Sequence, residues 1–295
     1  MKLALGTVQF GLNYGVSNAQ GQVSVEEIDR ILQLASRHNI DTLDCAYAYG
    51  NSEQNIGNNS HSQSFNLVTK IPALRANEDK ITTYFDTSLQ RLKRDSVECL
   101  LLHDANNIID HPAKAYICEQ LLKLKSFGLV KKIGVSVYTP EQVIQAAEAL
   151  PIDVVQAPMN LLDQRFCQSE VSHFFSQHHI ELHTRSAFLQ GLLLMDSNMR
   201  PAYFSQFNSL LNQVDDLAQQ YKTSKLTIAL AFLVQNSLVE SNLEKIVVGC
   251  CSAEQLQQIV DSYYNALDLN ISELDWTVFS STEQALINPS LWKTD

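Results

Sequence analysis

The chain has 295 residues, of which 45% are hydrophobic and 18% are charged. These fractions are near those of globular proteins, so the chain can bury a sizeable core. Its 21 basic and 32 acidic side chains give a formal charge of −11, which argues against a protein that holds nucleic acid or an anionic membrane through electrostatic contacts. We therefore expect neither partner, and an anionic ligand must meet a local positive site.

The six cysteines predict reduced thiols rather than a disulfide framework. No pair has CxxC spacing, and the adjacent Cys250 and Cys251 are poorly placed for an unstrained disulfide. The first residues, MKLALGTVQFG, contain an apolar run too short for a signal peptide. No stretch approaches the roughly 18 apolar residues of a membrane span. These observations favour a soluble, cytoplasmic protein.

Short apolar, β-branched runs alternate with segments of helical periodicity along the chain. Strands are expected at residues 3–6, 42–44, 66–70, 97–102, 132–136, 154–157, 181–185 and 245–248. Helices are expected at residues 25–38, 53–57, 78–92, 113–126, 140–150, 168–177, 224–235 and 253–267. Eight strands in strict alternation with eight helices predict an α/β fold, a (β/α)8 TIM barrel that forms a single domain over residues 1–295.

Several helix ends carry local signals. Ser24 with Glu27 predicts a capping box, and Asn77 precedes an acidic first turn. Thr139 is expected to cap a helix whose first residue is Pro140. Gly128 stands where the fourth helix needs a left-handed cap.

Two segments fall outside the eight units. Residues 195–220 predict an extra helix and loop after the seventh strand, and residues 271–286 predict a further C-terminal helix. No GxGxxG follows any strand, so the usual dinucleotide fingerprint of an open sheet is absent.

Polar residues at adjacent strand ends predict one catalytic group, because side chains at the C-terminal ends of barrel strands converge on one mouth. The second strand ends at Asp44, with Tyr49 five residues on; the third ends at Lys70, and His103 follows the fourth. A tyrosine phenol can protonate a carbonyl oxygen if a neighbouring cation lowers its pKa from about 10. We expect Lys70 to be that cation, Asp44 to hold the lysine, and His103 to orient the substrate oxygen.

These residues resemble the aldo-keto reductase superfamily. The segment LDCAYAYGNSE at residues 43–53 is similar to the family's Asp and catalytic Tyr segment, and VTK at 68–70 and LLH at 101–103 are similar to the strand ends that supply its Lys and His. Further segments follow in the family's order, so the resemblance covers roughly residues 5–266.

The resemblance implies an oxidoreductase that reduces small aldehydes or ketones with NADPH or NADH, bound across the barrel mouth. Ser136 and Gln156 would hold the nicotinamide carboxamide, and Arg185 stands where the family commonly stacks an aromatic ring on the nicotinamide. The family's contacts to the pyrophosphate and adenosine fall on Gln190, Gly191, Leu192, Gly249, Cys250, Ser252, Gln255 and Gln258.

Two departures from the family pattern bear on the cofactor. Val137 stands where an Asn often makes a second carboxamide contact, and residues 249–255 contain no Lys or Arg where many relatives bind the 2′-phosphate. NADPH is the family's usual cofactor, and these residues leave NADH equally open.

Other interpretations stay open at this point. A regulatory or sensor barrel would bind the cofactor without turnover, whereas a Schiff-base lyase would need an uncharged Lys70, which Asp44 disfavours. The histidines at 173, 178, 179 and 183 lack partners at ligand spacing, so no metal is expected.

The substrate and the oligomeric state are not indicated by any motif. We expect residues 104–112, residues 195–207, Trp276 and Trp292 to line the pocket, and the polar Asn106, Asn107 and Asp110 hint at a hydroxylated substrate such as a sugar.

Overall fold

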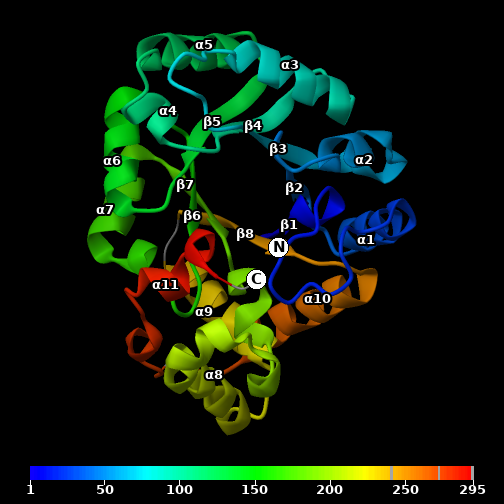
Figure 1. Ribbon diagram of the computed structural model, residues 1–295, viewed down its shortest axis with the longest axis vertical. Coiled ribbons are helices and arrows are strands. Elements are labelled where there is room, and N and C mark those ends of the chain that lie inside the picture. The colour runs from blue at the N-terminus through cyan, green and yellow to red at the C-terminus, as the bar shows by residue number, and fades with distance from the viewer. Residues whose placement is uncertain (240–241, 272, 294–295) are drawn as a thin grey trace.

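The computed structural model describes residues 1–239, 242–271 and 273–293. Its eight strands run parallel and close into one barrel in chain order, with β1 hydrogen-bonded to β8 (Figure 1). The strands are β1 Leu3–Gly6, β2 Thr42–Asp44, β3 Asn66–Ile71, β4 Val97–Leu102, β5 Val130–Ser136, β6 Val154–Pro158, β7 Glu181–Arg185 and β8 Leu243–Gly249. The predicted (β/α)8 barrel is therefore confirmed.

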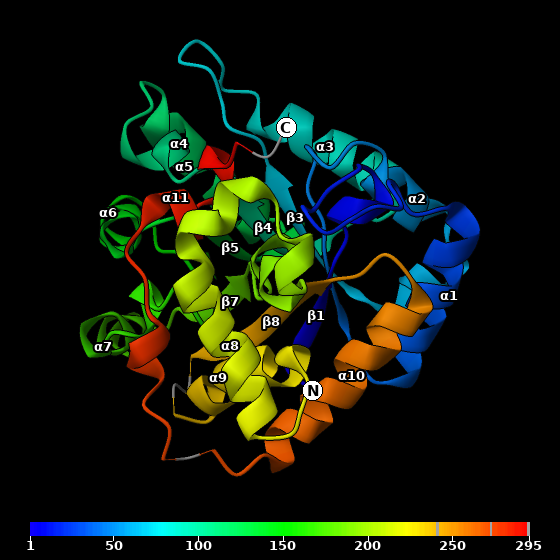
Figure 2. The ribbon, with the colours of Figure 1, turned by 60° about the horizontal axis from the view of Figure 1, so that its bottom comes forward.

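Helices surround the barrel on its outside, as the turned view shows (Figure 2). Those that follow successive strands are α1 Val25–Arg37, α2 Ser52–Asn58, α3 Ile81–Leu92, α5 Lys114–Ser126, α6 Pro140–Ala149, α7 Ser169–His178, α9 Lys225–Val239 and α10 Ala253–Asp268. A short α4, Asn106–Ile109, precedes α5. Helices α1 and α10 lie side by side, which brings the first and last units of the chain together. No helix in the described part of the chain is long and apolar enough to cross a membrane.

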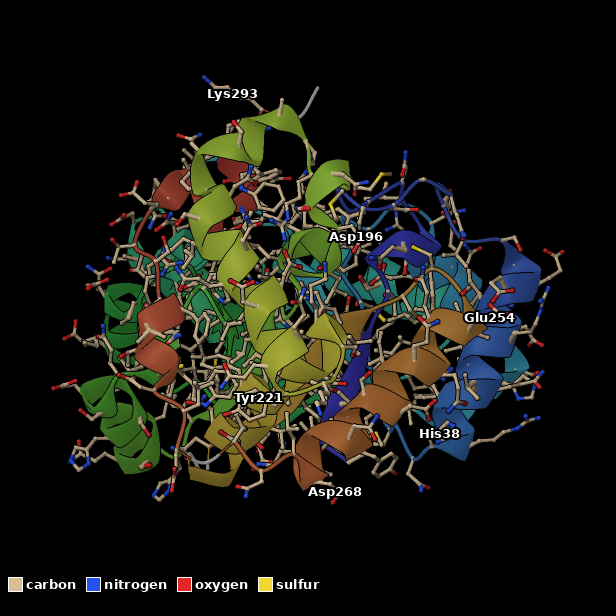
Figure 3. All side chains as sticks on the ribbon, turned by 90° about the horizontal axis from the view of Figure 1, so that it is seen from below. His38, Asp196, Tyr221, Glu254, Asp268 and Lys293 are labelled. Atoms are coloured by element: carbon tan, nitrogen blue, oxygen red, sulfur yellow. The ribbon has the colours of Figure 1, made fainter. Side chains whose placement is uncertain are left out.

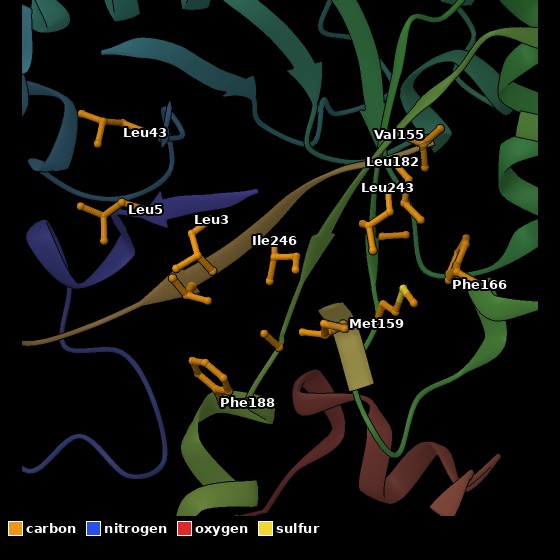
Figure 4. Close-up of a cluster of buried hydrophobic side chains, with 14 of the residues drawn as sticks. Leu3, Leu5, Leu43, Val155, Met159, Phe166, Leu182, Phe188, Leu243 and Ile246 are labelled. Carbon is orange, nitrogen blue, oxygen red and sulfur yellow. The ribbon is translucent and has the colours of Figure 1, made fainter. Parts of the chain in front are cut away.

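The strands separate two hydrophobic clusters, because successive side chains point to opposite faces of a strand. Side chains such as Leu3, Leu43 and Val155 belong to the large cluster between the sheet and the helices (Figure 4). The smaller cluster consists of Val68, Cys99, Leu101 and Val154. A Cβ on Gly134 of β5 would lie 1.8 Å from the Val154 carbonyl oxygen, so the barrel admits no larger residue there.

Most of the predicted helix ends are confirmed. Ser24 Oγ accepts a hydrogen bond from the Glu27 N–H, but the Glu27 carboxylate accepts from the Ala253 N–H, so only half of the predicted capping box forms. Pro140 begins α6, and Gly128 has φ +73° after α5. The start predicted at Asn77 is wrong, because α3 begins at Ile81, the first residue of this segment to enter the core. The preceding Glu78 instead accepts a hydrogen bond from the Tyr84 hydroxyl.

The insertion after β7 contains the predicted extra helix, α8 Asn208–Gln220, preceded by 3-10 turns at Ser197–Met199 and Ala202–Phe207. Arg200, nearly buried, lies 2.6 Å from Asp215 of α8, and Lys225 of α9 lies 2.9 Å from the same carboxylate. In Figure 3, Asp196 marks the start of this insertion. The ion pairs fix the insertion against α9.

The predicted C-terminal helix over residues 271–286 is wrong in its described part; residue 272 lies outside the described residues. Two short turns, Trp276–Phe279 and Pro289–Leu291, flank the four-residue α11 Gln284–Ile287. Phe279, Leu286 and Ile287 are buried in separate turns rather than along one helical face. The C-terminal segment therefore packs on the rest of the protein as a series of short turns rather than as one helix.

Candidate active site

Three adjacent strands bring the predicted catalytic group together. Lys70 of β3 is fully buried, and its Nζ donates to Asp44 Oδ2 at 2.7 Å and to the Cys45 carbonyl at 2.9 Å. The same ammonium lies 3.4 Å from the Tyr49 hydroxyl. The rings of Tyr49 and His103 meet edge to face, with centroids 5.7 Å apart. Phenol, ammonium, carboxylate and imidazole thus share one site.

A close approach between two loops holds Tyr49 in place. A Cβ on Gly11, in the loop after β1, would lie 1.8 Å from the Tyr49 carbonyl oxygen, so only glycine fits there. Gly50 has φ +57°, which favours glycine as well. Ser52 Oγ donates to the Thr7 carbonyl at 2.8 Å and ties the start of α2 to β1.

The phenol of Tyr49 is a weaker acid than the sequence predicts. Burial raises its pKa, and this effect outweighs the lowering by the Lys70 ammonium, while Asp44 raises the pKa further. The expectation of a lowered pKa was therefore wrong: a buried phenolate loses its hydration, and Asp44 largely neutralises the lysine. Tyr49 consequently holds its proton at neutral pH.

The neighbouring groups have fixed charge states at neutral pH. Burial alone would lower the pKa of Lys70, but Asp44 and Tyr49 raise it above its ordinary value, so the amine stays protonated. For His103, burial and the Lys70 charge lower the pKa to about 4. The His103 imidazole is therefore neutral and can donate one hydrogen bond.

A cavity of about 630 Å³ opens above this group. Of the predicted site residues, those that line it are Asp44, Tyr49, His103, Ser136, Gln156, Arg185, Gln190, Gly191, Gly249, Cys250, Gln255 and Gln258. Three do not. Lys70 lies beneath Tyr49, the Leu192 side chain is buried in the hydrophobic core, and Ser252 caps α10 by accepting from the Gln255 N–H.

Two of the three residues predicted to hold the nicotinamide end, Gln156 and Arg185, contact other parts of the protein. Gln156 Nε2 donates to Asp44 Oδ1 at 2.7 Å, so its amide links the cavity wall to the carboxylate that pairs with Lys70. Arg185 stacks on the Tyr138 ring, with Cζ 4.4 Å from the centroid, and donates to the Val137 carbonyl at 3.0 Å. One face of the guanidinium is therefore covered by the protein.

The loops after β1 and β7 touch along the cavity. Gln190 Nε2 donates to the Tyr14 hydroxyl at 3.1 Å, and Ser17 Oγ donates to the Gln190 carbonyl at 3.3 Å. A Cβ on Gly191, which has φ +89°, would lie 1.8 Å from Ser17 Oγ. Contact between these loops thus requires both the left-handed backbone and the missing side chain of Gly191.

At the other end, the cavity reaches the start of α10, where Glu254 lies in the first turn beside α1 (Figure 3). Gln255 Oε1 accepts from the Cys251 N–H at 2.7 Å. Burial raises the pKa of the Cys250 thiol. Among the described residues that line the cavity, none at this end is a Lys or an Arg.

Several lining residues were missed in the sequence, and the loop after β1 supplies many of them. Gln9 and Tyr14 follow β1, and Tyr138 follows β5. Their signal in the sequence is a polar side chain soon after a strand end, the same signal that Asp44, Lys70 and His103 give. Apolar lining comes from Phe188, Leu194, Met195 and Leu226, among others.

The segments expected to select the substrate lie largely elsewhere. Asn107 accepts from the Leu74 N–H and donates to the Pro72 carbonyl, so it is a structural residue. Trp276 donates to Gln235, and Trp292 packs edge to face on Phe204. Neither tryptophan lines the cavity, nor do residues 104–112, and the hint of a hydroxylated substrate loses its basis. Within the described residues, no three His, Cys, Asp or Glu side chains are grouped to hold a metal ion.

Comparison with known proteins identifies the family of the chain. The Aldo/keto reductase family model matches residues 2–275, so the chain belongs to this family. Its members are oxidoreductases that act on small carbonyl compounds and generally use nicotinamide cofactors.

Individual relatives are distant. The chain is 27% identical to the methylglyoxal reductase DkgB of Yersinia pestis over 192 residues, which cover 63% of this chain and 69% of the relative. It is 23% identical to the aldo-keto reductase YhdN of Bacillus subtilis over 66% of each protein.

Solved structures share the fold. The holo form of aldo-keto reductase AKR11C1 from Bacillus halodurans superposes with a TM-score of 0.71 at 18% identity over 93% of both chains. The glycerol dehydrogenase AKR11B4 of Gluconobacter oxydans gives 0.67 at 19% identity over 92% of both.

Proposed function

We propose that this protein is an NADPH- or NADH-dependent carbonyl reductase in which Tyr49 protonates the substrate oxygen. The observation that carries the proposal is the buried Lys70 ammonium, 2.7 Å from Asp44 and 3.4 Å from the Tyr49 hydroxyl, below a cavity lined by Tyr49 and His103. When bound, the reduced nicotinamide would supply the hydride.

The residues divide the acid chemistry among them. Tyr49, protonated at neutral pH, donates its proton to the oxygen on which negative charge develops. Lys70 stabilises the phenolate that remains, and Asp44 keeps the ammonium paired between turnovers. The neutral His103 donates a hydrogen bond to the carbonyl oxygen and sets its position. A protonated Lys70 also argues against a Schiff-base mechanism.

The cavity fits a dinucleotide in size and lining. It runs from Tyr49 to Gln255 and Gln258 of α10, with about 630 Å³ of space. Ser136 and the free oxygen of Gln156 would hold the carboxamide, and Gln190, Gly191 and Gly249 the phosphates. Since no Lys or Arg lines the α10 end in the described residues, we expect NADH to bind nearly as well as NADPH.

Replacing Tyr49 by Phe tests the acid. Tyr49→Phe should lower kcat by about 100- to 10,000-fold, because only the proton donor is removed. Turnover is followed by the absorbance of the reduced nicotinamide with a panel of aldehydes, and cofactor affinity by its fluorescence. The affinity should stay within about threefold of the unmutated protein.

The matched control is Tyr264→Phe, which removes a hydroxyl from an exposed tyrosine of α10. Its kcat should not change. Retained activity in Tyr49→Phe removes this tyrosine from the acid role. Cofactor binding without turnover of any carbonyl compound by the unmutated protein would instead support a regulatory barrel.

A further inference from the structure

The cavity carries one uncompensated positive charge. Asp44 and Arg185 are the formally charged side chains among the described residues that line it. Asp44 is neutralised by Lys70 at 2.7 Å. No carboxylate in the described part of the chain forms an ion pair with Arg185, although the protein has 32 acidic side chains. A half-buried cation without a counter-charge is costly, so a ligand anion is its natural complement.

The contacts of Arg185 direct it toward the catalytic end of the cavity. Arg185 ends β7, whose neighbours in the barrel are β6 and β8. Its guanidinium reaches past β6 to the Val137 carbonyl and the Tyr138 ring, which follow β5. It therefore leans away from β8 and from the α10 end where cofactor phosphates would lie. Burial, the Lys70 charge and the Arg185 charge all lower the pKa of His103, which agrees with this placement.

The guanidinium is held rigidly and has donors to spare. A guanidinium carries five N–H groups in one plane. Two of them donate hydrogen bonds within the protein, one to the Val137 carbonyl and one to Ser186 Oγ at 3.5 Å. The stack on Tyr138 fixes the plane. A planar guanidinium with free N–H groups binds a carboxylate or a phosphate far better than it binds a neutral carbonyl compound.

We propose that Arg185 binds an anionic group of the substrate, so that the protein selects carbonyl compounds that carry a carboxylate or a phosphate. This inference rests on the proposed reductase function. The shared chemistry is a fixed negative charge on the carbonyl compound, presented to a guanidinium in a cavity whose other described lining residues, apart from Asp44 beside Lys70, are neutral polar or apolar. Arg185 is thus a specificity-determining residue rather than a proton donor.

A matched substrate pair tests the proposal on the unmutated protein. 4-Carboxybenzaldehyde and its methyl ester have the same ring and the same reacting group, and differ by one negative charge. We expect kcat/KM to be about 10- to 100-fold higher for the acid, chiefly through KM, because hydrogen bonds to charged groups have this strength. The same comparison of kcat/KM between glyceraldehyde 3-phosphate and glyceraldehyde tests a phosphate. The pair with the larger ratio shows which of the two anionic groups Arg185 prefers.

Variants then assign the preference to Arg185. Arg185→Gln should abolish it, and Arg185→Lys, which keeps the charge but loses the fork, should retain part of it. The control is Arg37→Gln, which removes a positive charge from an exposed position at the end of α1. It should leave the preference intact. Thermal unfolding of each variant verifies the fold.

Each result has one meaning. No preference for either anion in the unmutated protein overturns the inference, even if Arg185→Gln fails to fold. An Arg185→Gln variant that weakens cofactor binding and slows acid and ester equally also overturns it, because Arg185 then serves the cofactor. If no neutral or charged carbonyl compound is reduced, the proposed function itself fails.

Discussion

The Lys70 ammonium lies beside two groups, the Asp44 carboxylate and the Tyr49 hydroxyl. Asp44 requires a cation, since a buried carboxylate without one is unstable. In the proposed mechanism, Tyr49 requires the same cation only after it has lost its proton. The carboxylate, at 2.7 Å, is closer than the phenol, at 3.4 Å. The pair Lys70–Asp44 is therefore poised to stabilise the phenolate without generating it in advance.

This arrangement predicts a level pH profile for the reduction. The raised pKa of Tyr49 keeps the acid protonated until above about pH 10, its ordinary value. The His103 imidazole, with a pKa of about 4, is charged only in strong acid. Hence kcat/KM for a neutral aldehyde should change little between about pH 6 and pH 10, as measured by initial rates with unfolding checked at each pH. Activity that declines with an apparent pKa between about 7 and 9 would show that the ammonium dominates.

The elements around Tyr49 position it through backbone contact. The loop after β1 presses Gly11 against the Tyr49 carbonyl, and Ser52 anchors the start of α2 to Thr7. The Tyr49 hydroxyl is thus placed by two loops that follow different strands. A small shift between these loops displaces the hydroxyl from Lys70, and a misplacement of about 1 Å can lower a rate by about 100-fold.

Gly11→Ala tests that dependence. Its Cβ would meet the Tyr49 carbonyl oxygen at 1.8 Å, so the loops must separate. We expect kcat to drop by about tenfold or more and the free energy of unfolding by about 1–3 kcal/mol. The control is Gly128→Ala, where φ is +73° but no atom lies within 4 Å of the new Cβ. It should cost about 1 kcal/mol of stability and leave kcat unchanged. Equal kcat in both variants would refute the positioning role.

Sequence patterns predicted the helices and strands whose apolar residues recur at a regular spacing, and they missed the segments without such a spacing. The strand ends that carry Asp44, Lys70 and His103 were placed correctly, because a run of buried β-branched or leucine residues stops at a polar one. The helix predicted for the C-terminal segment was wrong, because its apolar residues are buried from separate short turns rather than from one helical face.

The same contrast applies to the site. The residues proposed to be catalytic lie at or shortly after strand ends, where the sequence pattern singles them out. Tyr14 lies in an irregular loop, and its place in the cavity depends on contact with Gln190, which is distant in the sequence. The raised pKa of Tyr49 could not be predicted from the sequence either, because the degree of burial of the hydroxyl decides whether its pKa rises or falls.

The barrel as a whole encloses a second neutral histidine. His183 of β7 is 6% exposed, and burial lowers its pKa to about 4. An unfolded histidine has a pKa of about 6.5, so the unfolded chain binds more protons between these values. This part of the stability is complete above about pH 6.5 and is lost as the pH falls toward 4.

Accordingly, the thermal midpoint should decline between about pH 6.5 and pH 4. His183→Gln should make that decline about half as steep, with His103 supplying much of the rest. Circular dichroism melts across this pH range measure both slopes. His178→Gln, at the exposed end of α7, is the control and should leave the slope as it was. An unchanged slope in His183→Gln would mean that this histidine titrates normally.

The pairing of β1 with β8 joins Leu3 to Ile246 and Gly6 to Gly249 across almost the full length of the chain. A ribosome must therefore complete β8 before the ring can shut. Until then the nascent chain carries two open strand edges, which are sites for wrong pairing with other molecules. Non-local closure of this kind slows folding, so the yield of native protein in a cell depends on how well those edges are shielded during synthesis.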